Sequence, residues 1–292
     1  MVSINDILQD VQALPALSST ALRLIMMLSD SDVDLNEARE IIRLDEAITV
    51  VVLRNANSAG YGISGKTFSL EESIVRLGTK RLLKIALEQQ ISRVMVGAGA
   101  SYGLRRGSLW RGSLGGALAA EELATEIKFD EIELCFVCSL LRDIGKLTFD
   151  AYFGPDRILE CASNVEPGLS FLETERNLLG VDHAELGGAL AEHWELPERI
   201  ANAIRFHHCP PPDGDHHDEL YDIVHAGDVM ALWMGLAIGH DGLQYPLASH
   251  VKNGVLGSRD HAERIMMKTW ARLQELEADM NETTFQGQGK SA

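Results

Sequence analysis

The sequence predicts an all-α fold, and three observations support that prediction. Apolar residues recur at helical spacing through nearly every periodic segment, as in STALRLIMML at 19–28. Polar residues with capping chemistry stand where helices would begin: Asp34 precedes Glu37, and Ser69 precedes Glu72, each by the spacing of a capping box. Glycine and proline gather between these segments, where they end helices. We find no convincing strand pattern, so a multi-helix bundle is expected.

Each helix is placed by its apolar period and by the residues that end it. The first stops before Pro15, and no helix can cross the proline-rich loop 209–217. The β-branched run in 45–56 could form a strand, but the polar residues at its end favour a helix. Gly145 is expected to break the helix that carries Asp143. The helices are predicted over residues 5–13, 18–29, 35–44, 45–56, 69–78, 79–96, 108–126, 131–143, 156–162, 169–179, 182–194, 197–208, 218–238 and 260–280.

A glycine- and serine-rich break at 97–107 suggests how the chain is divided. We predict an N-terminal helical subdomain over 1–100, a helical core over 101–238 and a C-terminal helical extension over 239–280. The last residues, 281–292, are polar and are expected to be disordered.

The bulk composition excludes several classes of protein. The 292 residues carry 26 Lys and Arg against 43 Asp and Glu, a net charge of −17, which disfavours nonspecific nucleic-acid binding. Four cysteines show no disulfide framework, and Cys135 and Cys138 are expected to be core residues rather than zinc ligands. The sequence shows neither a signal peptide nor a membrane span. A cytoplasmic protein is therefore expected.

Five polar residues fall on helix faces that should be buried. Asp228 lies one helical step from Val224, on an apolar face, where a carboxylate needs a cation, a metal or several donors. Separate local partners could satisfy each residue, but four helices would direct all of them inward, which favours one shared metal or nucleotide pocket. The five residues are Asp143, His183, His207, His208 and Asp228.

These residues occur in segments that resemble the HDOD proteins, a branch of the HD phosphohydrolase superfamily. The resemblance covers roughly residues 14–235 and implies an HD-domain-like core. The matching segments are LPALSSTALRLIMMLSD at 14–30, LDEAITVVVLRNANSAGYG at 44–62, SLEESIVRLGTKRLLKIAL at 69–87, LWRGSL at 109–114, LLRDIGKL at 140–147, DHAELGGALAEHWELPERIANAIRFHH at 182–208 and VHAGDVMALWMG at 224–235.

Catalytic relatives in this superfamily imply metal-ligand positions at Gly112, Arg142, Asp143, His183, His207, His208 and Asp228, and a phosphate-contacting lysine at Lys146. Two of the ligand positions are lost, because glycine has no side chain and a guanidinium cannot bind a metal. Arg142, Asp143 and Lys146 are therefore interpreted as the remains of a catalytic motif. We hypothesise that Arg142 fills the space left at Gly112 and bridges Asp143 and Asp228. The alternative is that Arg142 points into solvent.

Three functions follow as hypotheses. The resemblance implies a bacterial signal-transduction module, catalytically inactive, that acts through a signalling protein partner or a small nucleotide ligand and needs no cofactor. The second hypothesis is a metal-dependent phosphohydrolase or phosphodiesterase with an incomplete, mononuclear site for one divalent ion (Fe, Mn, Zn or Mg). The third is a scaffold whose N-terminal helices, residues 1–95, bind a partner. No membrane contact is expected, and the oligomeric state is left open.

Overall fold

The computed structural model describes residues 3–10, 17–30, 34–57, 69–165 and 169–287, and all regular secondary structure within these ranges is helical. The all-α prediction is confirmed. In chain order the helices are α1 (Ile4–Asp10), α2 (Ser19–Leu28), α3 (Leu35–Leu44), α4 (Glu46–Asn57), α5 (Leu70–Leu77), α6 (Thr79–Met95), α7 (Ser108–Ile127), α8 (Ile132–Leu141), α9 (Ile144–Tyr152), α10 (Gly154–Ser163), α11 (Phe171–Leu179), α12 (His183–His193), α13 (Glu198–Arg205), α14 (Glu219–Trp233), α15 (Ser249–Asn253) and α16 (Arg259–Gly287).

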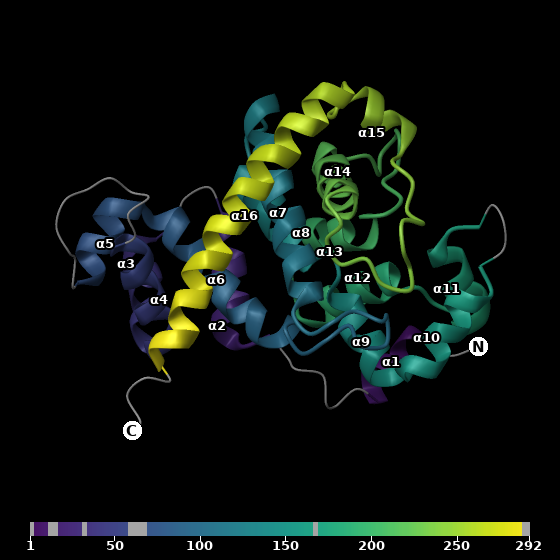
Figure 1. Ribbon diagram of the computed structural model, residues 1–292, viewed down its shortest axis with the longest axis horizontal. Helices are drawn as coiled ribbons and strands as arrows, with labels where there is room; N and C mark the ends of the chain where they lie inside the picture. Colours follow the sequence, from purple (N-terminus) through teal and green to yellow (C-terminus); the bar gives the residue numbers. More distant parts are fainter. Residues whose placement is uncertain (1–2, 11–16, 31–33, 58–68, 166–168, 288–292) are drawn as a thin grey trace.

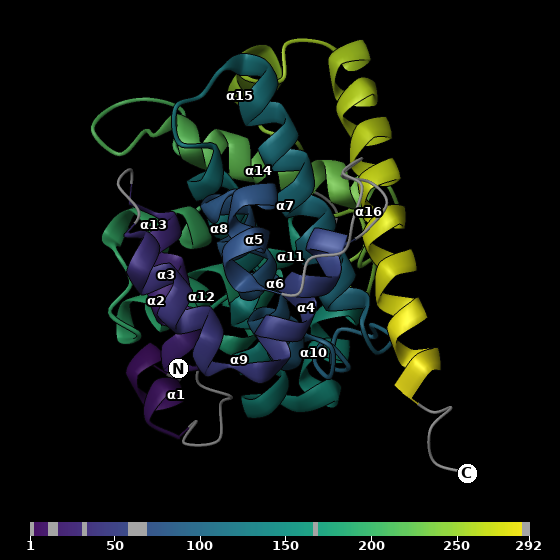
Figure 2. The same cartoon turned by 90° about the vertical axis from the view of Figure 1, so that its left-hand side faces the viewer.

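Helices α2 to α6 form one group, at the left of Figure 1, and helices α7 to α14 form a larger bundle beside it. Helix α7 connects the two groups, because it packs against α6 on one side and against α8, α14 and α16 on others. The long helix α16 runs along the outside of the molecule from α15 back toward the N-terminal helices, and Figure 2 shows it at one edge. The division of the chain into domains remains a prediction.

Helices α7 and α14 approach each other closely because small residues face one another. A Cβ atom added to Gly227 of α14 would lie 2.7 Å from the carbonyl oxygen of Gly116 and 3.0 Å from the Cβ of Ala120, both in α7. Interiors packed at this density leave no room for a side chain there. The close contact brings Asp228 of α14 up to the face of α7.

The structure corrects the prediction that Gly145 breaks a helix. Helix α8 ends at Leu141, and Gly145 lies inside a further helix, α9, that the sequence analysis did not predict. A Cβ atom at Gly145 would lie 1.8 Å from the carbonyl oxygen of His183, so the glycine allows α9 to pack against the start of α12. The residue is required for a close helix–helix contact rather than for a break.

The predicted helix over 218–238 ends earlier, at Trp233. Gly235 has a φ of 78° and Ala237 a φ of 52°, a left-handed backbone that no α-helix can contain. The chain therefore leaves the helix axis and crosses the bundle. It next becomes helical at α15, which the sequence analysis also missed because it spans only Ser249–Asn253.

At the C-terminal end, α16 continues to Gly287, although residues 281–292 were predicted to be disordered. The helix contains no proline, and its only glycine is the last residue, so nothing interrupts propagation once packing has started the helix. Residues 288–292 lie outside the described part of the chain. At the N-terminal end, α1 stops at Asp10, and residues 11–13 of the predicted helix also lie outside it.

Cys135 and Cys138 are buried free thiols, and burial raises the pKa of both, as expected for core residues. Among the described helices, none combines the length and the apolar character that crossing a lipid bilayer requires.

Candidate metal and ligand site

Five elements bring the predicted polar residues together in the interior of the larger bundle. The junction of α8 and α9 supplies an arginine, an aspartate and a lysine. Helix α12 begins with a histidine, two more histidines follow α13, and α14 contributes an aspartate. Every one of these side chains is buried, with relative exposures between 0 and 5%: Arg142, Asp143, Lys146, His183, His207, His208 and Asp228.

Arg142 lies inside the protein, and the predicted bridge between two carboxylates is confirmed. Its Nε donates a hydrogen bond to Asp228 Oδ1 at 2.7 Å and lies 3.4 Å from Asp143 Oδ2. Nη1 donates to the carbonyl oxygen of Ser139 at 2.7 Å, and Nη2 donates to that of Gly112 at 3.1 Å. Burial opposes the charge, but the two carboxylates outweigh it and raise the pKa of Arg142. The guanidinium is therefore a satisfied buried cation.

The space around the guanidinium differs in one respect from the hypothesis. Arg142 does not fill the position of the missing side chain at Gly112. A Cβ there would lie 2.3 Å from the Cβ of Ala237, which covers that spot. The guanidinium instead lies over Gly116, where a Cβ would be 2.5 Å from Nη1. Gly112 of α7 therefore leaves room for the segment that follows α14, and Gly116 leaves room for the arginine.

Two of the three histidines are held by a hydrogen bond at Nδ1. His183 Nδ1 lies 2.8 Å from Glu175 Oε2, and His207 Nδ1 lies 2.6 Å from the carbonyl oxygen of Ile204. With these acceptors, a neutral ring carries its proton on Nδ1 and keeps a lone pair on Nε2, the arrangement common in metal-binding histidines. Burial opposes protonation of His183, but Glu175 outweighs it and raises the pKa of that ring. His208 Nδ1 lies 3.1 Å from Asp228 Oδ2, which favours the same tautomer.

The free ring nitrogens converge on one spot. Ligand atoms of Asp143, His183, His207 and His208 all lie within 4.8 Å of one another. His183 Nε2 and His208 Nε2 are 3.1 Å apart, close to the separation of about 3.3 Å between two nitrogens on one tetrahedral ion with bonds of about 2.05 Å. Among the described residues, His207 Nε2 meets no hydrogen-bond partner despite full burial. These four donors fit one metal ion.

Asp228 does not belong to this convergent set, although it was predicted as a ligand with the other four. Its Oδ1 accepts from Arg142 and its Oδ2 faces the far side of the His208 ring. Burial opposes its ionisation, but Arg142 outweighs burial and holds the pKa of Asp228 well below its usual range. The Asp228 carboxylate therefore balances the charge of Arg142.

The electrostatics of the site keep the carboxylates charged and two histidines neutral. Burial opposes ionisation of Asp143, but Lys146 and Arg142 outweigh it and lower the pKa of that carboxyl. Burial lowers the pKa of His208 to about 4 and that of His207 well below its ordinary value. Neutral imidazoles beside a carboxylate are the form in which these groups bind metals.

Lys146 is enclosed by residues that the sequence analysis did not single out. Its Nζ lies 3.0 Å from Asp143 Oδ1 and donates a hydrogen bond to Asp241 Oδ2 at 2.9 Å. The Tyr245 hydroxyl donates to the same Asp241 oxygen at 3.2 Å. The Tyr245 ring stacks on the His208 ring with centroids 3.7 Å apart and planes 5° from parallel.

Glu175 was also missed. It accepts hydrogen bonds from the backbone N–H of His183 at 3.0 Å and from the Tyr102 hydroxyl at 2.7 Å, besides contacting the His183 ring. Its place on an inward face of α11 was the available signal, since a carboxylate there needs donors. Asp241 and Tyr245 had no such signal, because they lie in a segment without helical period.

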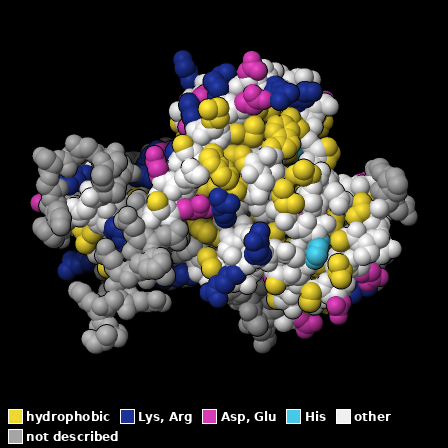
Figure 3. All heavy atoms as spheres, viewed as in Figure 1, with side chains coloured by type: hydrophobic (Ala, Val, Ile, Leu, Met, Phe, Trp, Pro, Cys, Tyr) yellow, Lys and Arg dark blue, Asp and Glu magenta, His cyan; other side chains and the backbone are white. Residues whose placement is uncertain are grey.

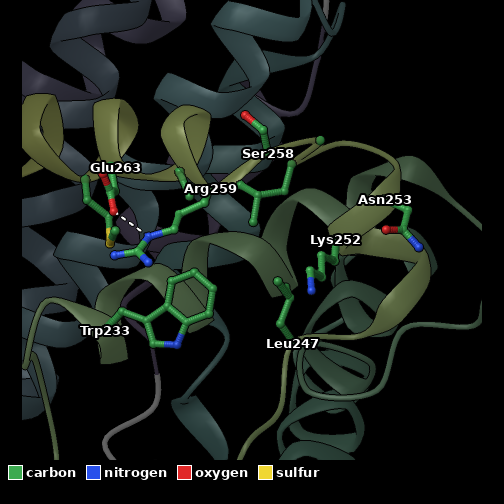
Figure 4. A pocket seen from close by; sticks show the side chains of 11 residues that line it. Trp233, Leu247, Lys252, Asn253, Ser258, Arg259 and Glu263 are labelled. Atoms are coloured by element: carbon green, nitrogen blue, oxygen red, sulfur yellow. Dashed lines mark hydrogen bonds and ion pairs between the residues drawn. The ribbon is translucent and has the colours of Figure 1, made fainter.

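A separate groove lies on the surface where α14 to α16 meet (Figure 4). It encloses about 480 Å³. In Figure 4 the Trp233 indole lies at one side and the Lys252 and Leu247 side chains at the other, with Arg259 held by Glu263 above the indole. Figure 3 shows hydrophobic side chains among basic and acidic ones over the same part of the molecule. The groove contains none of the buried site residues.

Fold and site together define an all-helical protein with a buried aspartate–histidine cluster and a buried arginine beside it. The HDOD domain family matches residues 14–210, and the chain belongs to that family. It is 28% identical over 233 residues to an uncharacterized protein of Treponema pallidum (strain Nichols), covering 76% of this chain and 42% of that protein. The chain thus spans less than half of that relative's length.

Solved structures share the fold. An HDOD domain protein of unknown function from Geobacter sulfurreducens aligns with a TM-score of 0.69 at 22% identity, over 97% of this chain and 94% of that one. A candidate signal-transduction protein from Marinobacter aquaeolei VT8 aligns with a TM-score of 0.69 at 22% identity, over 93% of this chain and 60% of that one. A candidate phosphohydrolase from Shewanella amazonensis SB2B aligns with a TM-score of 0.63 at 21% identity, over 90% of this chain and 97% of that one. At these identities the likeness shows the fold alone.

Proposed function

We propose that this protein is a bacterial regulatory HDOD module that performs no hydrolysis and acts in signal transduction through a protein partner or a small nucleotide ligand. The observation that carries the proposal is the buried Arg142, which is bound to Asp228 and lies beside Asp143. The names of the similar solved proteins include both signal transduction and phosphohydrolase, so the residues of this chain must decide between the two.

Arg142 supplies the reason to prefer a regulator. Hydrolysis of a phosphate ester needs cationic groups that contact the substrate oxygens and a group that activates water. The Arg142 guanidinium donates its hydrogen bonds to Asp228 and to backbone carbonyls of α7 and α8, so these N–H groups do not face a substrate. Its charge neutralises the carboxylates that could otherwise hold an ion in that half of the site.

Burial is a second support. The ammonium of Lys146 is taken up by Asp143 and Asp241, and its side chain is only 6% exposed. A substrate phosphate could reach this lysine only if those contacts were broken. A pocket in this state is suited to a conformational response rather than to rapid turnover.

The alternative is a mononuclear metal-dependent hydrolase, and the convergence of four donors within 4.8 Å favours it. Three imidazoles and one carboxylate suit Zn, Fe or Mn better than Mg. Asp143, His183, His207 and His208 would hold the ion, which when bound would supply a water of lowered pKa. Glu175 would fix the orientation of His183.

One experiment separates the two functions. Protein loaded in turn with Zn²⁺, Mn²⁺ and Fe²⁺ is analysed for bound metal and assayed with bis(4-nitrophenyl) phosphate, with Asp143→Ala as the matched control. We expect no turnover above that control with any metal. Turnover by the wild-type protein that is lost in Asp143→Ala would establish the hydrolase and refute the regulator.

A further inference from the structure

The segment between α14 and α15, residues 235–248, lies across the buried site and is here named the plug. It contains no helix and turns at Gly235, Ala237 and Gly242, where φ is 78°, 52° and 55°. It lies beyond residue 210, where the match to the HDOD family ends. The plug is therefore a feature of this chain that the family match does not cover.

The plug inserts two side chains into the site. Asp241, which is 1% exposed, places its carboxylate 2.9 Å from Lys146 Nζ, and Tyr245, which is 5% exposed, stacks its ring on His208. The Tyr245 hydroxyl joins the two by its hydrogen bond to Asp241. An anionic group thus covers the lysine, and a flat ring covers the histidine.

The plug is anchored by the buried side chains of Leu236, Asp241 and Tyr245, and exposed residues lie between these anchors. Its backbone is held by hydrogen bonds from His240 N to the carbonyl oxygen of Tyr102 at 2.7 Å and from Ala248 N to His225 Nε2 at 3.0 Å. Between these points Leu243 is 63% exposed. Trp233, just before the plug, and Leu247, near its end, line the surface groove of Figure 4, so both ends reach the surface.

We propose that the plug is an autoinhibitory cover: Asp241 and Tyr245 occupy the site as an intramolecular ligand, and local opening of residues 235–248 exposes it. An irregular segment whose backbone is exposed between its buried anchors can open at a lower free energy than the whole fold. A ligand that displaces the plug carries an anionic group and a flat ring, as the two side chains do. This inference deepens the proposed function, on which it rests, by naming how the site is regulated.

The test measures access to His208 and uses neither metal nor substrate. Diethyl pyrocarbonate modifies accessible imidazoles, and mass spectrometry of peptides gives the rate at each histidine. The variants are Tyr245→Ala, which removes the stacked ring, and Asp241→Asn, which keeps the shape but removes the charge facing Lys146. Leu243→Ala, on the exposed side of the plug, is the matched control, and exposed His216 is the internal standard.

We expect His208 to be protected in the wild-type protein and in Leu243→Ala. In both site-facing variants its rate should rise about tenfold or more, because each loses an interaction that closes the plug. Hydrogen exchange should show faster exchange at 235–248 with α7 and α14 unchanged, which separates opening from unfolding.

Equal protection of His208 in the wild-type protein and in the correctly folded Asp241→Asn variant would overturn the proposal. So would a wild-type His208 that reacts as fast as His216. Either result leaves the test of hydrolysis unaffected, and hydrolysis by the wild-type protein would refute the regulator without changing what this assay reports about the plug.

Discussion

The two halves of the buried site use the same kinds of groups in opposite ways. On the side facing α7, Asp228 and backbone carbonyls surround the guanidinium of Arg142, so a permanent cation of the chain satisfies every acceptor it meets. On the side facing α12 and α13, ring nitrogens of three histidines and a carboxylate oxygen of Asp143 converge. In the first half the charges of Arg142 and Asp228 balance without a ligand, whereas in the second half His207 Nε2 is buried without a hydrogen-bond partner.

This difference shows two ways in which the charges of one buried site can be balanced. A buried carboxylate must have a cation, but a protein side chain can supply it as well as a metal can. In the arginine half, the glycine at 116 leaves room for the guanidinium. In the histidine half, Glu175 and the carbonyl of Ile204 orient two rings.

The largest effect is expected when the arginine half is emptied. Arg142→Ala leaves Asp228 buried without its cation, which should lower the free energy of unfolding by about 3–5 kcal/mol. Denaturant unfolding followed by circular dichroism measures the loss. Arg259→Ala, whose side chain is 89% exposed, is the control and should change stability little. A variant as stable as that control would show that Arg142 does not neutralise the half that we assign to it.

The next effect concerns only the histidine half. Glu175→Gln removes the carboxylate that orients His183 and should weaken Zn²⁺ affinity by about 10–100-fold. Competition with a chromogenic chelator measures the affinity. Glu160→Gln, on the exposed surface, should bind like the wild-type protein. Unchanged affinity in Glu175→Gln would mean that zinc binds elsewhere.

A smaller effect tests the fit of the arginine. In Gly116→Ala the new Cβ would lie 2.5 Å from Nη1, so the guanidinium must move from its four acceptors. We expect a loss of about 1–3 kcal/mol from overpacking, partly offset by about 1 kcal/mol of helix propensity. Gly97→Ala, where a Cβ meets nothing within 4 Å, is the control.

Combining Gly116→Ala with Arg142→Ala in a double-mutant cycle sharpens this result. The cost of the alanine should vanish once the arginine is absent, because the two groups compete for the same space. Additive losses would instead place the strain between α7 and α14, where the carbonyl of Gly116 already faces Gly227.

The sequence predicted which residues meet in each half of the site, but not what covers them. Arg142 lies beside Asp143 at the end of an apolar helix, where a permanent cation has few buried partners. Asp228, on the inward face of α14, was the evident one. The sequence did not predict that Ala237 covers Gly112 or that Tyr245 covers His208. Both lie after α14 in a segment without period, and its path depends on left-handed residues and long-range contacts.

Glycine was the other source of error. Gly145 follows an apolar helix, where a glycine usually marks the end, but here it permits contact with the His183 backbone. The two roles have the same local sequence and differ only in what packs against the residue. The helical periods themselves, set by burial of one face, were sufficient to place most of the other helices.

The central claim is that Arg142 replaces an ion in one half of the site and leaves a single metal position in the other. Its most direct test is the stoichiometry of Zn²⁺ bound to metal-free wild-type protein, measured by elemental analysis after equilibrium dialysis. The account predicts saturation at one ion per chain, lost in His207→Ala. Saturation at two ions per chain, with both lost in Asp143→Ala, would contradict it.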